Sequence, residues 1–173
     1  MKFVFTLLSA LALVGCKEEI ASAPPPPMDL SQDALSFFCQ MTVSEHGGPK
    51  GQVHLDGYPA PLFFAQVRDM VAYLKSPERD AEIMAVYVSD MGVAASWEKP
   101  GVSNWTDASE ATFVVEANVR GGMGAAEIVP FAKMSDAQAF ALRWGGRPVN
   151  LNAIPDHAAI GAVDTLLILE TPS

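Results

Sequence analysis

The sequence predicts an α+β fold made of two similar ββαβ units packed together, following a signal peptide and a proline-rich tether. Half of the 173 residues are hydrophobic, which is enough for a packed core. Each half of the body shows the same order of patterns, strand–strand–helix–strand. The first half contains Phe64-Ala65 and Asp69 at its helix. The second contains Phe131-Ala132 and Asp136, each 67 residues later, which favours a duplicated unit.

The N-terminus carries a candidate export signal. Lys2 is followed by an apolar run of twelve residues, 3–14. A run of this length is shorter than the about 20 residues that span a bilayer as a helix. It is typical of the hydrophobic region of a secretory signal peptide. We therefore expect residues 1–15 to be a signal peptide.

The signal ends at a lipidation motif. Leu13-Val14-Gly15-Cys16 is typical of a bacterial lipoprotein cleavage site, at which Cys16 becomes the acylated first residue. Acyl chains on Cys16 would hold the protein on a membrane surface without a spanning helix. The alternative is an ordinary signal peptide cut elsewhere, with Cys16 incidental. Residues 16–36 then form a lipidated tether, in which four consecutive prolines, 24–27, favour a stiff polyproline II spacer.

The first ββαβ unit is expected over residues 37–95. Residues 37–43 and 52–55 are predicted strands, separated by a glycine-rich turn. The next apolar residues recur at spacings of 3, 4 and 3, which predicts a helix that ends at Ser76-Pro77. These residues are Phe64, Val67, Val71 and Leu74. The apolar residues 83–88 predict a buried strand.

The second unit is expected over residues 96–173. Residues 111–117 and 126–131 are predicted strands on either side of a glycine-rich loop. Ser135 is expected to cap a helix that ends at a pair of glycines. Residues 165–169 are expected to form the last strand.

Charge and cysteine content exclude several classes of function. Lys and Arg number 11 against 20 Asp and Glu, a net charge of −9, so the chain has no basic surface for nucleic acid. Two cysteines cannot form a disulfide framework. With Cys16 acylated, Cys39 is the only remaining thiol, and a lone thiol is open to oxidation in an exported compartment. Either Cys39 is buried as a small hydrophobe or it has a chemical role.

Cys39-Gln40-Met41 is the main candidate for that role. On an extended strand, residues two apart point to the same face, so the sulfurs of Cys39 and Met41 could approach one ion. A thiolate with a thioether is a soft pair of ligands that selects Cu(I) over Zn(II) or Mg(II). The alternative is that Met41 only fills the core.

Two further residues are candidate ligands. If the halves are duplicates, Gly121-Gly122-Met123 takes the place in the second unit that Cys39-Gln40-Met41 has in the first, and Met123 would be a third sulfur ligand. Glycines on both sides would expose its thioether, whereas a core-packed Met123 is the alternative. His46 is a further candidate ligand or else a polar turn residue. His54 and His157 are expected to be ordinary surface or hydrogen-bonded histidines.

Enzymatic alternatives lack supporting motifs. A thiol-dependent hydrolase would need Cys39 activated by an imidazole, and no Ser-His-Asp, phosphate-loop or paired-carboxylate motif accompanies it. A zinc site would need three or four Cys or His ligands, and only one thiol and three scattered histidines are present. A lipid-anchored interaction or scaffold module with an inert, buried Cys39 is the other alternative.

Several short blocks together carry a family resemblance. In order, they are Cys39-Gln40-Met41-Thr42-Val43, Glu45 to Gln52, Tyr87-Val88-Ser89-Asp90, Trp105-Thr106-Asp107-Ala108, Gly122-Met123-Gly124, Phe131-Ala132 and Gly145-Gly146. They extend over nearly the whole chain from Cys16 and resemble the NosL family of nitrous-oxide reductase accessory lipoproteins. One departure is Gln40, where the family commonly has glycine. The departure leaves both sulfur positions intact.

The resemblance implies a pair of ββαβ units and a membrane-anchored copper(I) chaperone on the periplasmic side of a bacterial membrane. Such a protein would supply copper for maturation of nitrous-oxide reductase. Its partners would be the reductase assembly machinery, a membrane transporter complex or the reductase, and membrane lipid through acylated Cys16. We therefore expect a Cu(I)-binding protein that is not an enzyme. Copper would be held by Cys39, Met41 and Met123, with His46 as a further candidate, and would leave by ligand exchange.

Overall fold

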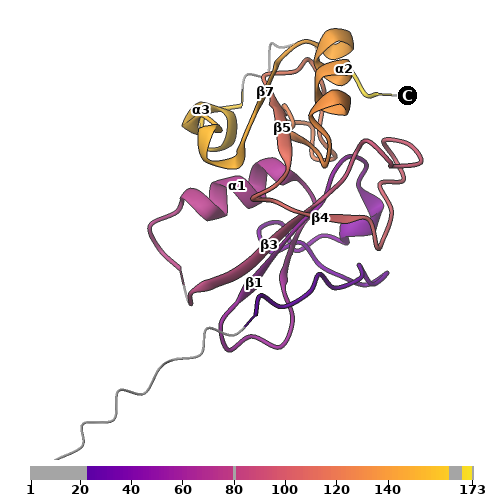
Figure 1. The fold of residues 1–173 in the computed structure, drawn as a ribbon. Coiled ribbons are helices and arrows are strands. Elements are labelled where there is room, and N and C mark those ends of the chain that lie inside the picture. The colour runs from indigo at the N-terminus through magenta and orange to yellow at the C-terminus, as the bar shows by residue number, and fades with distance from the viewer. Residues whose placement is uncertain (1–22, 80, 164–168, 173) are drawn as a thin grey trace, which may run out of the picture.

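The computed structural model describes residues 23–79, 81–163 and 169–172. Over these residues the chain forms a four-stranded sheet with strand order β2-β1-β3-β4 and a three-stranded sheet with order β6-β5-β7 (Figure 1). Mixed sheets and helices confirm the predicted α+β class. All of the paired strands in both sheets are antiparallel.

The first unit consists of β1 (Gly51–Leu55), β2 (Leu62–Phe64), α1 (Val67–Lys75) and β3 (Ile83–Ser89), with β4 (Trp105–Asp107) added at the edge of its sheet. The second consists of β5 (Thr112–Val115), β6 (Val129–Phe131), α2 (Met134–Trp144) and β7 (Arg147–Val149). The described elements also include two 3-10 turns, Val43–Glu45 and Leu151–Ala153, and the short helix α3 (Asp156–Ala159).

The two units share one topology, as the sequence predicts. In each, the first strand is central, with the second strand on one side and the third on the other. Phe64 ends β2 opposite Gly51, and Phe131 ends β6 opposite Thr112. The helix begins three residues after each phenylalanine, at Val67 and Met134. The offset of 67 residues therefore relates equivalent positions in the fold.

Helix α1 lies between the first sheet and the second unit (Figure 1). Its buried residues Val67, Met70 and Val71 recur at helical spacing and pack toward β1 and β2. Gly51 in β1 leaves room for this packing, because an added Cβ would lie 2.5 Å from the Met70 Sδ. The helix ends at Ser76, because the following proline disfavours helical backbone at the residue before it.

The two units share a hydrophobic core. One cluster of buried side chains joins Phe64, Met70 and Val88 of the first unit to Phe113 and Ile128 of the second. A second cluster lies under α2, where Ala137 and Phe131 pack with Val114 and Val129. Because the main cluster draws side chains from both sheets, the units are fixed against each other by apolar burial.

Several predicted elements differ from the structure. Residues 37–43 are not a strand but the end of a hairpin, because the Gln40 N–H donates to the Ser36 carbonyl and closes a turn. The helix α2 begins at Met134, with Lys133 rather than Ser135 in the capping position. The strand predicted at 126–131 begins only at Val129. The strand predicted at 165–169 falls almost wholly on residues 164–168, outside the described residues.

The N-terminal segment lies against the first unit from Pro25 onward. The Met28 N–H donates to Gln52 Oε1 at 2.9 Å, and Gln52 Nε2 donates to the Met28 carbonyl at 3.0 Å. The Tyr87 hydroxyl donates to the Pro25 carbonyl at 2.8 Å. Leu30 packs in a small cluster with Ala34 and Val43. This part of the expected tether is therefore attached to the sheet by direct contacts.

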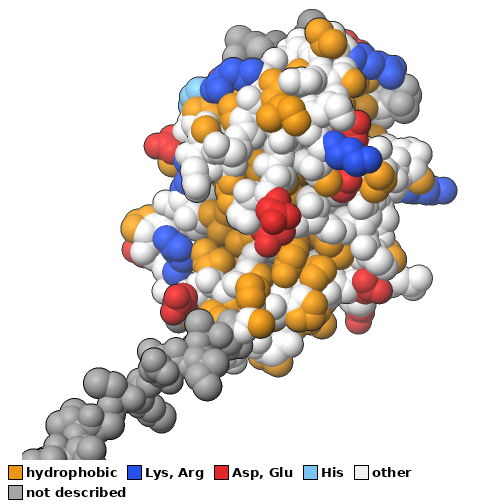
Figure 2. All heavy atoms as spheres, in the orientation of Figure 1, with side chains coloured by type: hydrophobic (Ala, Val, Ile, Leu, Met, Phe, Trp, Pro, Cys, Tyr) orange, Lys and Arg blue, Asp and Glu red, His pale blue; other side chains and the backbone are white. Residues whose placement is uncertain are grey.

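The described residues contain no helix that is both long enough and apolar enough to cross a bilayer. The face seen in Figure 2 has scattered acidic and basic side chains, with apolar areas over the lower, first unit. No single sign of charge dominates this face.

Candidate metal centre

Cys39 and Met41 lie on either side of a left-handed residue at the tip of the hairpin. The Ser36 N–H donates to the Met41 carbonyl at 2.9 Å, and the Gln40 N–H donates to the Ser36 carbonyl at 2.8 Å. Gln40 has φ 57°, so Cys39 and Met41 are not two residues of one strand, as the sequence analysis expected. The thiol of Cys39 is free and partly exposed, and Met41 is 45% exposed. Both sulfur-bearing residues are therefore accessible at one turn.

The backbone at Gln40 explains why the NosL resemblance has glycine at this position. A left-handed conformation costs an L-residue about 1–2 kcal/mol, and glycine adopts it freely. Gln40 offsets the cost with its own side chain, because Nε2 donates to the Phe37 carbonyl at 2.8 Å and to the Ser36 carbonyl at 3.3 Å. The turn that presents Cys39 and Met41 is thereby kept without glycine.

Aromatic packing anchors the base of this turn. Phe37 and Phe38 both contact Phe64 and Tyr73, with ring centroids 5.4–6.4 Å apart. The Phe37 N–H also donates to the Phe63 carbonyl at 2.8 Å. The hairpin is therefore attached to the end of β2, and the Cys39 turn projects from a fixed base.

Met123 lies in the glycine-rich loop between β5 and β6. The Gly121 N–H donates to the Ala125 carbonyl and the Gly124 N–H to the Gly121 carbonyl, which closes a tight loop. Gly124 has φ 88°, a conformation that requires glycine. Met123 is 39% exposed, in agreement with the expectation that this loop does not bury it in the core.

The sequence analysis placed Met123 in the site because its loop was expected to be the duplicate of the Cys39 turn, and this equivalence is wrong. The loop of Met123 follows the first strand of its unit, whereas the turn of Cys39 precedes the first strand of its unit. The counterpart of the Met123 loop is the connection 56–61 between β1 and β2. The two sulfur segments are therefore not equivalent positions of the repeat.

Both segments are nevertheless attached to the same short stretch of chain, residues 63–66, between β2 and α1. On one side, the Ala65 N–H donates to Ser36 Oγ at 3.2 Å in the hairpin of Cys39. On the other, the Met123 N–H donates to Gln66 Oε1 at 2.9 Å. Adjacent residues thus hold the two segments, although no hydrogen bond joins the segments directly in the described part of the chain.

His46 lies against the Met123 loop. Its Nδ1 is 3.2 Å from the Gly122 carbonyl, so Nδ1 carries the proton that it donates. A Cβ on Gly122 would lie 2.7 Å from both the His46 Cβ and the Gly47 carbonyl oxygen, so only glycine permits this approach. The His46 Nε2 is buried and has no hydrogen-bond partner among the described residues. A histidine fixed through Nδ1 with a free Nε2 has the form that metal-binding histidines adopt.

A buried lysine supports the backbone between these groups. Lys50 is only 1% exposed, and its Nζ donates to the carbonyls of His46, Gly47 and Ala65, the latter two at 3.1 Å. Burial lowers the pKa of Lys50 to about 8, although the charges of Glu127 and Glu98 favour its protonated form. Lys50 was not a candidate in the sequence analysis, because a lysine next to glycines and a proline resembles a solvated turn residue.

Glu127 is a buried acidic residue whose charge acts on that of Lys50. Its Oε1 accepts hydrogen bonds from the backbone N–H groups of Arg68 at 3.0 Å and Ile128 at 2.9 Å. Burial raises the pKa of Glu127 to about 8, against the opposing effects of those two hydrogen bonds and of the Lys50 charge. A Cβ on Gly121 would lie 2.5 Å from Glu127 Oε2, so the loop of Met123 rests directly on this carboxyl group.

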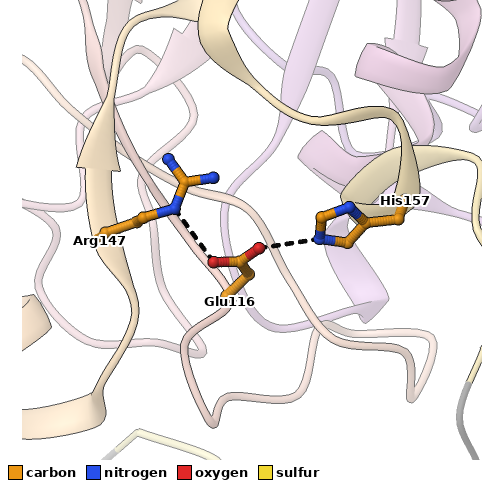
Figure 3. A network of polar contacts seen from close by, with 3 residues as sticks. All are labelled: Glu116, Arg147 and His157. Atoms are coloured by element: carbon orange, nitrogen blue, oxygen red, sulfur yellow. Dashed lines mark hydrogen bonds and ion pairs between the residues drawn. The ribbon is translucent and has the colours of Figure 1, made fainter.

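The other two histidines serve structural contacts, as expected. His54 is buried, and its Nε2 is 2.8 Å from Gln52 Oε1. His157 lies on α3, where Nε2 is 2.8 Å from Glu116 Oε1, while Arg147 Nε donates to Glu116 Oε2 at 3.1 Å (Figure 3). The His157 hydrogen bond, followed by the contact with Arg147, holds the pKa of Glu116 below its ordinary value. This surface network joins α3, β7 and the end of β5.

Across the described residues, no three His, Cys, Asp or Glu side chains gather in a group that could hold a metal ion. The sulfurs of Cys39, Met41 and Met123 are soft donors and the Nε2 of His46 is an intermediate one, and such donors suit a monovalent copper ion.

Comparison with known proteins gives one consistent result. The family model of NosL matches residues 27–159. The copper-binding lipoprotein NosL of Achromobacter cycloclastes is 45% identical over 166 residues, covering 95% of this chain and 86% of that protein. The copper-binding lipoprotein NosL of Stutzerimonas stutzeri is 33% identical over 154 residues, covering 87% and 78%.

Solved structures agree with the sequence comparisons. The crystal structure of the copper chaperone NosL from Shewanella denitrificans superposes with a TM-score of 0.70 at 31% identity, covering 75% of this chain and 97% of that one. The solution structure of apo-NosL from Achromobacter cycloclastes gives a TM-score of 0.50 at 48% identity, covering 66% and 92%. The resemblance seen in the sequence blocks is thereby confirmed, and the chain belongs to the NosL family.

Proposed function

We propose that this chain is a membrane-anchored metallochaperone that carries Cu(I) on the periplasmic side of a bacterial membrane and supplies it for the maturation of nitrous-oxide reductase. Relatives that are 45% and 33% identical to it are named copper-binding lipoproteins. The observation that carries the proposal is the presentation of Cys39, Met41 and Met123 at two exposed turns attached to adjacent residues.

The ligand set favours Cu(I) over other biological metals. A cysteine thiolate and two methionine thioethers are soft donors, and soft donors bind Cu(I) in preference to Zn(II) or Mg(II). His46 Nδ1 donates to the Gly122 carbonyl, and the buried Nε2 has no hydrogen-bond partner among the described residues, so Nε2 is a nitrogen donor for an ion that reaches this buried position. Cys39 binds as the thiolate, so copper uptake releases a proton.

Exposure of the donors suits transfer rather than storage. In a carrier, the acceptor's ligands must reach the ion while the carrier's ligands still hold it. Met41 and Met123 are each more than one-third exposed, so an incoming ligand can displace one thioether at a time. The thiolate of Cys39 then leaves last, because it is the strongest donor. This sequence needs no catalytic group, and we infer that the protein is not an enzyme.

The anchor and the partners follow from the N-terminal motif and the family. The sequence Leu13-Val14-Gly15-Cys16 supports lipidation at Cys16, which lies outside the described residues. We infer that acyl chains on Cys16 keep the protein at the membrane beside the copper-delivering and copper-receiving parts of the reductase assembly machinery.

A thiol-dependent hydrolase gains no support from the geometry. Cys39 and His46 are not hydrogen-bonded to each other in the described part of the chain, and the His46 Nδ1 is committed to a backbone carbonyl. The hydrogen bond to an imidazole that would activate the Cys39 thiol is therefore not formed with His46 in the described part of the chain.

The test is an anaerobic titration of the purified protein with Cu(I) against a competing chelator. The expected result is tight binding of Cu(I) that is lost in Cys39→Ser. Equal competition by the wild-type protein and Cys39→Ser would contradict the proposed site. Titration with Zn(II) under the same conditions serves as the control for metal selectivity.

A further inference from the structure

Gln66 is an unusual residue to find at the beginning of a helix. It occupies the position before Val67 with an extended backbone, and its side chain makes no capping hydrogen bond. It is nevertheless 3% exposed, so its polar amide is almost completely removed from water. A buried amide has to find partners elsewhere, since an unpaired one costs about 1–3 kcal/mol.

Those partners lie in two different units. Oε1 accepts the backbone N–H of Met123 at 2.9 Å, and Nε2 donates to Asp69 Oδ2 at 3.4 Å. The assignment of oxygen and nitrogen is fixed by these neighbours, because an N–H can only donate and a carboxylate can only accept. The helix α1 therefore orients an acceptor toward the loop of Met123.

The loop is shaped to receive this side chain. A Cβ on Gly121 would lie 2.6 Å from Gln66 Oε1, so the absence of a side chain at Gly121 creates the space that the amide fills. Met123 is flanked by Gly122 and Gly124, whose backbone dihedral angles are otherwise weakly restricted. The peptide group between Gly122 and Met123 is thus held at both ends: Gln66 Oε1 accepts its N–H, and its carbonyl accepts the hydrogen bond from His46 Nδ1.

The same stretch of chain, residues 63–66, also holds the hairpin that carries Cys39 and Met41. Ala65, next to Gln66, donates its N–H to Ser36 in the hairpin that ends at Cys39. Fixing Met123 on Gln66 therefore fixes it relative to the Cys39–Met41 turn. Preorganised ligands bind more tightly because less conformational entropy is lost when the ion arrives.

We infer that Gln66 is a positioning residue for copper binding: through the Met123 N–H it holds the third sulfur ligand at the place where it meets Cys39 and Met41. The inference rests on the proposed function. Gln66 makes no contact with copper and acts through Met123, so its effect must disappear when the Met123 thioether is absent.

A double-mutant cycle on Cu(I) affinity tests this dependence in the full-length protein. Gln66→Leu weakens Cu(I) binding about tenfold, the lower end of the range for outer-shell residues. Met123→Ala weakens it as well, and Gln66→Leu combined with Met123→Ala is no weaker than Met123→Ala alone. X-ray absorption of the Cu(I)-loaded Gln66→Leu protein shows fewer or more disordered sulfur scatterers than wild type.

Gln52 offers a matched control within the same chain. It is also fully buried, and its Oε1 also accepts the backbone N–H of an exposed methionine, Met28, at 2.9 Å. Gln52→Leu removes this hydrogen bond, together with those of Gln52 to the Met28 carbonyl and to His54, from a segment that carries no proposed ligand, so Cu(I) affinity stays at the wild-type value.

The outcomes separate this inference from the proposed function. Wild-type affinity in Met123→Ala would remove Met123 from the site and so contradict the proposed ligand set. Weaker binding in Met123→Ala with wild-type affinity in Gln66→Leu would overturn only the role of Gln66. The role is also overturned if Gln66→Leu weakens binding equally with and without the Met123 thioether, because the effect would then be general destabilisation. If Gln66→Leu does not fold, Gln66→Asn takes its place in the same cycle, because it keeps the amide but is one methylene too short to reach the Met123 N–H.

Discussion

The Ala65 N–H donates to Ser36 Oγ at 3.2 Å, one residue before the glutamine that holds Met123. A buried serine thus attaches the Cys39 hairpin to the chain that leads into α1. Since Ser36 is fully buried, this hydrogen bond is shielded from competition by water. The positions of Cys39 and Met123 depend on one rigid segment, although the two residues are 84 positions apart in the sequence.

Cys39→Ser is expected to weaken Cu(I) binding by more than about 100-fold, since even outer-shell changes cost about 10–100-fold. The serine hydroxyl is a hard, neutral group of similar size, and the partly exposed side chain makes little contribution to the core. The free energy of unfolding should therefore change by less than about 0.5 kcal/mol. Competition for Cu(I) against a chelator and urea denaturation measure the two effects, and a large loss of stability would show that Cys39 has a structural role instead.

Met123→Ala is expected to weaken Cu(I) binding less than Cys39→Ser does, because a neutral thioether contributes less than a thiolate. The copper X-ray absorption signal should lose one sulfur scatterer. Met134→Ala is the matched control, because Met134 is also exposed, at 52%, but lies on α2. Loss of affinity in both variants would indicate a general effect of methionine removal, and an unchanged sulfur count in Met123→Ala would leave His46 as the remaining candidate for the third ligand.

Gln40→Gly is expected to change the free energy of unfolding by less than about 1 kcal/mol. Glycine relieves the left-handed backbone but loses the two side-chain hydrogen bonds to Ser36 and Phe37. Gln40→Val, which loses the same bonds and places a β-branched residue at φ 57°, should destabilise the protein by about 2 kcal/mol. Gln32→Val, at an exposed position of the same segment, should stay within about 0.5 kcal/mol of wild type. Equal stability of the glycine and valine variants would contradict the assigned backbone.

Glu127→Gln is expected to change how stability depends on pH. Burial raises the pKa of Glu127 from 4.5 to about 8, so the folded protein binds this proton more tightly than the unfolded chain does. Its contribution is complete below about pH 4.5 and is lost as the pH rises toward 8. The contribution of Lys50, whose pKa is lowered to about 8, changes only above that pH.

The wild-type free energy of unfolding should therefore fall between pH 5 and pH 8 relative to that of Glu127→Gln. The difference should reach about 2 kcal/mol or more, because a difference of one in pKa corresponds to about 1.4 kcal/mol. Urea denaturation at several pH values measures it. Parallel profiles for the two proteins would mean that Glu127 ionises in the folded state as it does in water.

Cys16→Ala is expected to release the protein from the membrane or to leave it unprocessed, because the acylated cysteine is the proposed anchor. Fractionation of cells and mass spectrometry of the mature chain provide the measurement. A mature wild-type chain that begins elsewhere, or that carries a free Cys16 thiol, would rule out the anchor.

The duplicated architecture could be predicted because its signals are local. Phe64 and Phe131 end equivalent strands, and the helices that follow show clear apolar periodicity. The strands β2, β4 and β7 were missed because three residues are too few to establish an alternation. Residues 37–43 were mistaken for a strand because nothing in the identity of Gln40 indicates a left-handed backbone; the family's glycine at that position was the available signal.

The candidate ligands were found from residue chemistry, whereas their supports were not. A cysteine and a methionine two residues apart suggest a soft site wherever they occur, and glycines around Met123 suggest an exposed loop. Gln66 and Glu127 gave no such signal, because their roles depend on contacts between the two units, and Lys50 gave none because its burial depends on a contact with the Ala65 carbonyl. Burial of a polar side chain between two repeats is a property of the tertiary structure and has no periodicity to detect.

The shared core of the two units has a consequence for either unit alone. Phe64 and Met70 of one repeat bury against Phe113 and Ile128 of the other, so a single ββαβ unit would expose this apolar surface. A single unit on its own is therefore expected to associate with a second copy of itself or to lose its fold. Joining both units in one chain lets them differ in sequence, so that the hairpin before one unit and a loop within the other can carry the different ligands of the proposed site.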